Sequence, residues 1–60
     1  MQMYRVDYSN ENLGLDNEFD IIHAESDKEA LSEVLNNDTY ETIWDIVKID
    51  ENYDVIESIW

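Results

Sequence analysis

The sequence predicts an α+β fold in which one helix packs on one face of a small antiparallel sheet. Apolar and polar residues alternate near the N-terminus, which is the period of a half-buried strand. A middle segment has helical spacing behind a capping motif, and the chain after residue 41 is dense in β-branched and aromatic residues. We therefore expect the order strand, strand, helix, strand, strand in a single domain, residues 1–60.

The first predicted strand is MYRVDYS, residues 3–9. Its aromatic and β-branched residues alternate with polar ones, as in a strand with one buried face. The pattern places Tyr4, Val6 and Tyr8 on the buried face, and Met3, Arg5 and Asp7 on the other.

A hairpin is expected to join this strand to the next. Residues 10–17, NENLGLDN, contain three asparagines and the only glycine of the chain, which are turn-forming residues. Residues 18–25, EFDIIHAE, then predict the second strand, with Phe19 and Ile21 as its buried residues.

The helix is predicted over SDKEALSEVLNN, residues 26–37. Ser26 and Glu29 have the spacing of a capping box, in which each side chain binds an amide of the first turn. Either Asn36 or Asn37 is expected to close the helix in a left-handed conformation. The apolar stripe consists of Ala30, Leu31, Val34 and Leu35.

The segment DTYETIWDIVKID, residues 38–50, fits two structures. Tyr40, Ile43, Trp44 and Val47 have helical spacing. The density of β-branched and aromatic residues favours a strand over residues 42–49, and we predict that strand. A turn over 50–54 and a last strand over 55–60 complete the sheet.

The last two strands are apolar on both faces, and one helix can cover only one of them. The second face is expected to lie against the 10–16 loop, to be buried in a homodimer or to remain exposed as an interaction surface. Trp44 and Trp60 are core candidates first of all and also candidates for a dimer or other interface, where aromatic residues are frequent. For Trp60, at the end of the chain, the two roles are equally favoured.

Charge is the most unusual property of the composition. Sixteen Asp and Glu stand against three Lys and Arg, which gives a net charge of -13. This charge excludes nucleic acid and anionic membranes as direct partners and favours a basic protein. There is no Cys, no signal-peptide pattern and no apolar run of membrane length. We expect a cytoplasmic protein.

Asp16, Glu18 and Asp20 alternate in LDNEFD, so a strand would place three carboxylates in a row about 6.6 Å apart. Such a row suits a partner whose Arg and Lys grip successive phosphates, although a solvated strand face has the same pattern. The further carboxylates expected to bind the partner are Glu41, Asp45, Asp50, Glu51 and Asp54.

The sequence predicts neither catalysis nor a metal or cofactor site. DENYDVIE has the acidic spacing of a calcium loop, but Val55 stands where that loop requires glycine. His23 has no second His or Cys to share a metal with, and it is expected to lie at the rim of the core. No nucleophile motif or phosphate-binding glycine loop is present.

In size, acidity and predicted architecture, the chain resembles the small DNA-mimic inhibitors of phages and mobile elements. This class includes anti-CRISPR proteins, anti-restriction proteins and inhibitors of uracil-DNA glycosylase. The resemblance rests on composition and on the run IIHAESDKEALSEVL, and it transfers no functional residue. It implies an inhibitor that occupies the nucleic-acid cleft of a host enzyme. An acidic antitoxin or immunity protein and a small acidic interaction module are the alternatives.

Overall fold

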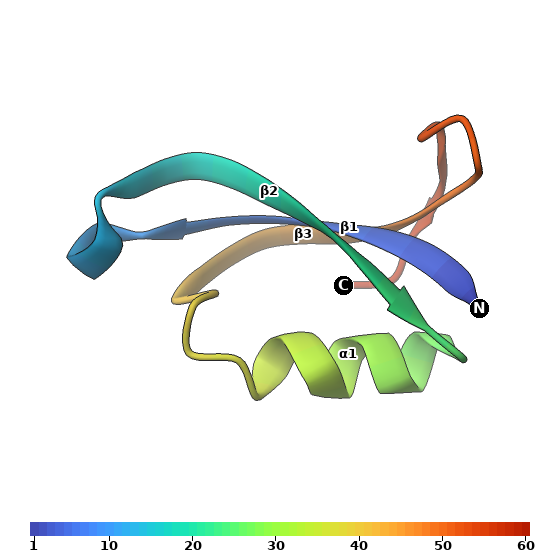
Figure 1. The fold of residues 1–60 in the computed structure, drawn as a ribbon, viewed down its shortest axis with the longest axis horizontal. Coiled ribbons are helices and arrows are strands. Elements are labelled where there is room, and N and C mark those ends of the chain that lie inside the picture. The colour runs from blue at the N-terminus through green and yellow to red at the C-terminus, as the bar shows by residue number, and fades with distance from the viewer.

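The computed structural model describes residues 1–60, and its centre is a four-stranded antiparallel sheet with one α-helix along one side (Figure 1). The sheet order is β2-β1-β3-β4. The α+β class is therefore confirmed at this level, whereas a 3-10 helix between the first two strands adds an element that the sequence pattern does not predict. The elements are β1 (Gln2–Asn10), η1 (Glu11–Leu13), β2 (Leu15–Ala24), α1 (Asp27–Leu35), β3 (Thr42–Ile49) and β4 (Val55–Ser58).

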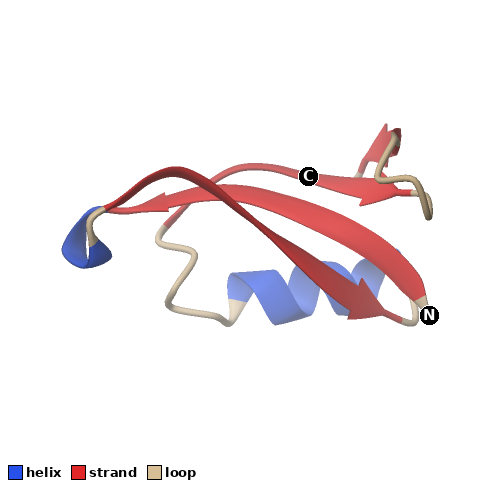
Figure 2. Cartoon of the chain, turned by 45° about the horizontal axis from the view of Figure 1, so that its top comes forward, coloured by secondary structure: helices blue, strands red, loops and turns tan.

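The central strand β1 supplies much of the core. Tyr4, Val6 and Tyr8 are buried, as their alternation predicts, and they face the side on which α1 lies. Ala30 and Val34 of α1 belong to the same buried cluster. Figure 2 shows the four strands together on one side of the helix.

The helix begins where the capping motif places it. Ser26 Oγ accepts a hydrogen bond from the Glu29 amide at 3.2 Å, which satisfies one free donor of the first turn. The left-handed C-cap is wrong, because Asn36 has φ -97° and the positive φ values outside glycine belong to other residues. The Asn36 side chain instead donates to the Ser32 carbonyl oxygen at 2.8 Å.

The first hairpin is tighter than the predicted loop over 10–17. Asn10 accepts a hydrogen bond from the Leu13 amide at 3.3 Å and so starts the short helix η1. Gly14 follows with φ 69°, a conformation that glycine adopts without strain. The second strand therefore begins at Leu15 instead of residue 18.

The burial predicted for β2 is wrong. Phe19 is 59% exposed, whereas Ile22 and Ala24 belong to the core. The cause is register, because Ile22 pairs with Tyr4 and so lies on the face that the helix covers. Phe19 and Ile21 have the opposite parity and lie on the other face.

The third strand spans the predicted residues 42–49 and is a strand, not a helix. β3 contains one residue more than the part of β1 that faces it. Asp7 pairs with Asp45 and the next residue, Tyr8, pairs with Ile43, so Trp44 between them has no partner on β1. The last strand ends at Ser58, two residues before the predicted end.

A polar network joins the start of α1 to the sheet. The Tyr4 hydroxyl donates to Asp27 at 2.7 Å, and Lys48 Nζ lies 3.3 Å from the same carboxylate oxygen. The hydrogen bond from Tyr4 and the Lys48 ammonium hold the pKa of Asp27 below its usual value. Burial and Asp27 raise the pKa of Tyr4 to about 12.

Replacement of Ile46 tests the importance of the helix-side core. Ile46 is fully buried, so Ile46→Ala should lower the free energy of unfolding by about 2–5 kcal/mol. A domain of this size has a total stability of about 3–9 kcal/mol, so much of the population should unfold. Ile56 is 58% exposed, and Ile56→Ala is the matched control. Urea unfolding followed by circular dichroism measures both variants, and equal losses would contradict this description of the core.

Candidate functional site

The side of the sheet opposite α1 has no helix over it, and we refer to it as the open face. In Figure 1 it is the upper side of the sheet, and the turn after β3 rises on this side. Val47 and Ile49 are buried there, yet they do not belong to the helix-side core cluster. From the strand register, the open face includes Met3, Arg5, Asp7, Phe19, Ile21, His23, Asp45, Val47 and Ile49.

A hollow of about 560 Å³ lies on the open face. Its walls come from three strands and from the turn between β3 and β4. Four of its six residues are hydrophobic, and the two polar ones form an ion pair with each other. The lining residues are Arg5, Asp7, Phe19, Ile21, Ile49 and Tyr53.

Tyr53 forms one wall of the hollow from a strained backbone position. Its φ is 67°, which a bulky side chain rarely adopts. The Tyr53 amide donates to the Asp50 carbonyl oxygen at 2.9 Å. The Asp50 carboxylate also accepts from the amides of Asn52 and Asp54, at 2.8 and 3.0 Å. A residue in this left-handed position of a short hairpin turn is usually glycine. The turn therefore carries an aromatic residue at a position whose backbone conformation favours glycine.

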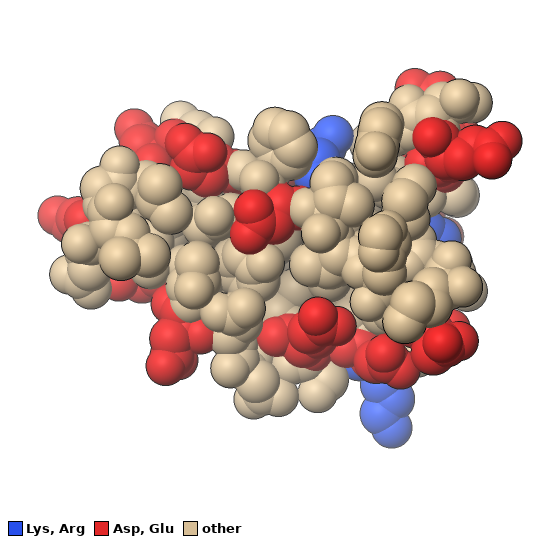
Figure 3. Space-filling view, in the orientation of Figure 1, with Lys and Arg blue, Asp and Glu red and all other residues tan.

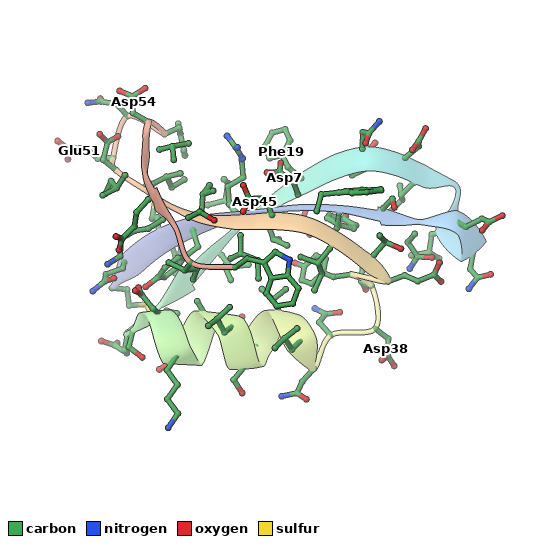
Figure 4. All side chains as sticks on the ribbon, turned by 180° about the vertical axis from the view of Figure 1, so that it is seen from behind. Asp7, Phe19, Asp38, Asp45, Glu51 and Asp54 are labelled. Carbon is green, nitrogen blue, oxygen red and sulfur yellow. The ribbon has the colours of Figure 1, made fainter.

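Two carboxylates lie side by side in the middle of the open face. Asp7 on β1 and Asp45 on β3 are opposite each other in the ladder, and Figure 4 shows them close together. Opposed like charges destabilise a sheet unless they are compensated. Arg5 lies 3.3 Å from Asp7, whereas Asp45 accepts from the Ser58 hydroxyl at 2.8 Å and has no cationic partner.

The predicted row of Asp16, Glu18 and Asp20 does not form. Between Leu15 and Glu18, β2 has one residue more than the part of β1 that faces it. Asn17 has φ 54° and accommodates the additional residue as a bulge. Asp16 is therefore out of phase with Glu18 and Asp20, which share the helix side of the sheet.

Asp20 makes an internal hydrogen bond. It pairs with Val6 in the ladder, and the Tyr40 hydroxyl donates to its carboxylate at 2.9 Å. The Tyr40 ring also meets Tyr8 edge to face, with 4.7 Å between ring centroids. Burial, followed by the Asp20 carboxylate, raises the pKa of Tyr40 above its ordinary value. The hydroxyl therefore keeps its proton at neutral pH, and Asp20 fastens the 36–41 loop to the sheet.

The remaining predicted carboxylates lie at the two ends of the molecule. Asp50, Glu51 and Asp54, the turn acids, follow β3. Glu41 lies at the other end, where the Asn12 amide group donates to it at 2.9 Å. Figure 4 shows Glu51 and Asp54 far from Asp38, which belongs to the loop before Glu41. In Figure 3, carboxylates appear at both ends, along the α1 side and at one place in the middle of the visible face, separated by uncharged surface. They do not form one continuous anionic flank.

Both tryptophans are exposed. Trp44, the extra residue of β3, is 59% exposed, and Trp60 is 56% exposed. Neither is a core residue, and a role at an interface stays a prediction. The 10–16 loop does not cover the open face, because Leu13 is exposed and Leu15 packs against the helix-side core.

The comparisons identify no relative: no family model, curated protein or solved structure matches the chain. Neither helix has the length and apolar character that a membrane crossing requires. His23 is exposed, and no group of three or more His or acidic residues comes together in a way that could hold a metal ion.

Sequence reasoning missed the hollow. It placed Phe19 in the core and Tyr53 in the turn over 50–54. The usable signal was the apolar character of both faces of β3 and β4, which implies that a surface remains uncovered. The position of Tyr53 over that surface depends on a left-handed backbone conformation, which a tyrosine does not favour.

Two substitutions separate the backbone strain at Tyr53 from the packing of its ring. Both substitutions remove the ring, but Asn tolerates a left-handed conformation whereas Ala keeps the strain. Tyr53→Asn should therefore exceed Tyr53→Ala in free energy of unfolding by about 1 kcal/mol. Urea unfolding of both variants measures the difference. An alanine variant as stable as the asparagine variant would show that the turn is not strained.

Proposed function

We propose that the chain is a non-enzymatic inhibitor that occupies the nucleic-acid-binding cleft of a host defence or repair enzyme. The observation that carries the proposal is the amount of negative charge left without compensation. Asp7, Asp27 and Glu57 are the carboxylates in ion pairs, which leaves thirteen of the sixteen without one. Arg5 and Lys48 are the cations that these pairs engage, so Lys28 is the only one outside an ion pair.

The size of the molecule supports the comparison with DNA. Its longest axis is 30 Å. Duplex DNA of that length carries about 18 phosphate charges, at one per 1.7 Å. The sixteen carboxylates of this chain therefore give a similar charge per length. A cleft lined with Arg and Lys would meet comparable charge from either ligand.

The distribution of the carboxylates changes how the mimicry works. A single row on β2 is not available, so the anionic contacts would come from the two ends of the molecule. The turn acids at one end and Glu11, Asp16, Glu18 and Glu41 at the other would contact cationic side chains around the cleft. The surface between them, which carries Asp7 and Asp45 among mostly apolar residues, would then face the middle of the cleft.

Competition with nucleic acid tests the proposal. Labelled duplex DNA is bound in turn to a purified CRISPR effector, a restriction enzyme and a DNA glycosylase, and its release is followed by fluorescence anisotropy. The chain should release the duplex from at least one of them. Its affinity should fall between about 50 and about 200 mM salt, because the contacts are ionic. If none of the three classes releases its DNA, the proposal is wrong.

Paired charge variants show whether position matters as well as total charge. Glu51→Gln with Asp54→Asn removes two turn acids, and we expect roughly three- to tenfold weaker binding. Glu29→Gln with Glu33→Gln removes the same charge from the exposed side of α1 and should cost less. Equal losses would mean that the total charge acts without a defined orientation.

A further inference from the structure

We propose that the hollow of the open face receives an aromatic side chain of a basic protein, at a position flanked by lysine or arginine in that partner. This inference rests on the proposed function for the basic character of the partner. It goes further because it assigns the contact surface and the residue class that fills it. Four independent features of the open face support it.

The first feature is exposed apolar area around a concave floor. Phe19 and Tyr53 are 59% and 63% exposed, and both line the hollow. Ile21 and Ile49 line it as well. Burial of such surface is the main source of affinity at interfaces, and aromatic anchors in pockets dominate it.

The second feature is the strained position of Tyr53. Strain in a backbone persists where the surrounding structure imposes it, and it is found preferentially at binding sites. Here two hydrogen bonds from the backbone amides of Asn52 and Asp54 to Asp50 hold the turn that carries the ring. The wall is therefore fixed before a partner arrives, which lowers the entropic cost of binding.

The third feature is Arg5, whose side chain lines the hollow and is one-third exposed. Its guanidinium is held at one edge by Asp7 at 3.3 Å. A planar guanidinium stacks well on aromatic rings. An aromatic residue of the partner therefore fits this hollow better than an aliphatic one.

The fourth feature is charge, and it decides between a basic protein and a second copy of the chain. Asp45 has no cationic partner, and the turn acids lie beside Tyr53. Lys or Arg on either side of the incoming aromatic residue would neutralise these carboxylates. A second copy would instead bring another net charge of -13 to the same surface. Like-charge repulsion therefore disfavours self-association through the open face.

The test uses three capped pentapeptides with the full chain at about 150 mM salt, where long-range attraction is screened. Arg-Arg-Trp-Arg-Arg carries both required features, Arg-Arg-Ala-Arg-Arg keeps only the charge, and Glu-Glu-Trp-Glu-Glu keeps only the ring. Backbone amide shifts are followed by nuclear magnetic resonance. The first peptide should bind at least roughly tenfold more tightly than the alanine peptide, because it buries an aromatic side chain. It should exceed the glutamate peptide by at least as much, because that peptide brings like charge to an acidic surface.

The shifts should concentrate on the hollow. We expect the largest changes at Phe19, Ile21, Ile49 and Tyr53. Phe19→Ala should remove most of the preference for tryptophan and leave the weak binding of the alanine peptide unchanged. Leu35→Ala is the matched control, because Leu35 is 55% exposed on α1 and should have no effect.

Three results would overturn the inference. The first is equal binding of the tryptophan and alanine peptides. The second is a set of shifts that maps to α1. The third is a preference for the tryptophan peptide that persists in Phe19→Ala. Sedimentation adds a fourth, because a dimer that is lost in Phe19→Ala would assign the open face to a second copy. The first two results are measured on the unaltered chain, so they do not depend on the folding of a variant.

The outcome separates this inference from the proposed function. DNA release that depends on the turn acids, without any preference for tryptophan, would keep the inhibitor proposal and reject the hollow as its contact. A preference for tryptophan without DNA release from any enzyme would keep the hollow as a basic-protein site and reject the inhibitor proposal.

Discussion

A single helix of nine residues cannot cover both faces of a four-stranded sheet, and this limit shapes the whole molecule. The chain uses the helix to bury Tyr4, Val6, Ile22 and Ile46 on one face. The residues of the opposite parity have no comparable cover, although several are apolar. Part of that surface is closed by the turn after β3, and the rest remains a concave area exposed to solvent.

Charge acts on this arrangement in two ways. The chain engages two of its three Lys and Arg in ion pairs, so almost all of the unpaired charge on its surface is negative. Most of the carboxylates are divided between the two ends of the molecule and the α1 side (Figure 3), although Asp7 and Asp45 lie opposite each other on the sheet. Separation limits repulsion in the folded state. It also leaves the apolar hollow between two acidic ends, which is the combination expected of a surface for basic proteins.

The sequence predicts those parts of the fold that depend on local chemistry. Ser26 starts the helix through its own side chain, and the β-branched run over 42–49 forms a strand. Features that depend on distant contacts were not predictable. Phe19 and Ile22 are both apolar, but they lie on opposite faces of β2. Only the position of the helix decides which of the two is buried. The bulge at Asn17 likewise moves Asp16 out of its expected row, because a residue in left-handed conformation shifts the parity of the strand.

The same reasoning explains the outcome for the candidate site. A strong acidic composition predicts the chemistry of a partner but not the geometry of the contact. The geometry of the open face comes from Tyr53, whose left-handed backbone is unfavourable for its own residue type, and from the pairing of Asp7 with Asp45 across two strands. Neither feature has a local sequence signal.

Site-specific photocrosslinking tests most directly the claim that the open face is the contact surface. A photoreactive benzoylphenylalanine is placed at Phe19 on the open face and, in a separate protein, at Leu35 on α1. Each is irradiated in a bacterial lysate with and without excess duplex DNA. The account predicts that position 19 alone crosslinks to a nucleic-acid-binding protein and that DNA suppresses the product. Equal crosslinking from both positions, or a product from position 35 alone, would contradict it.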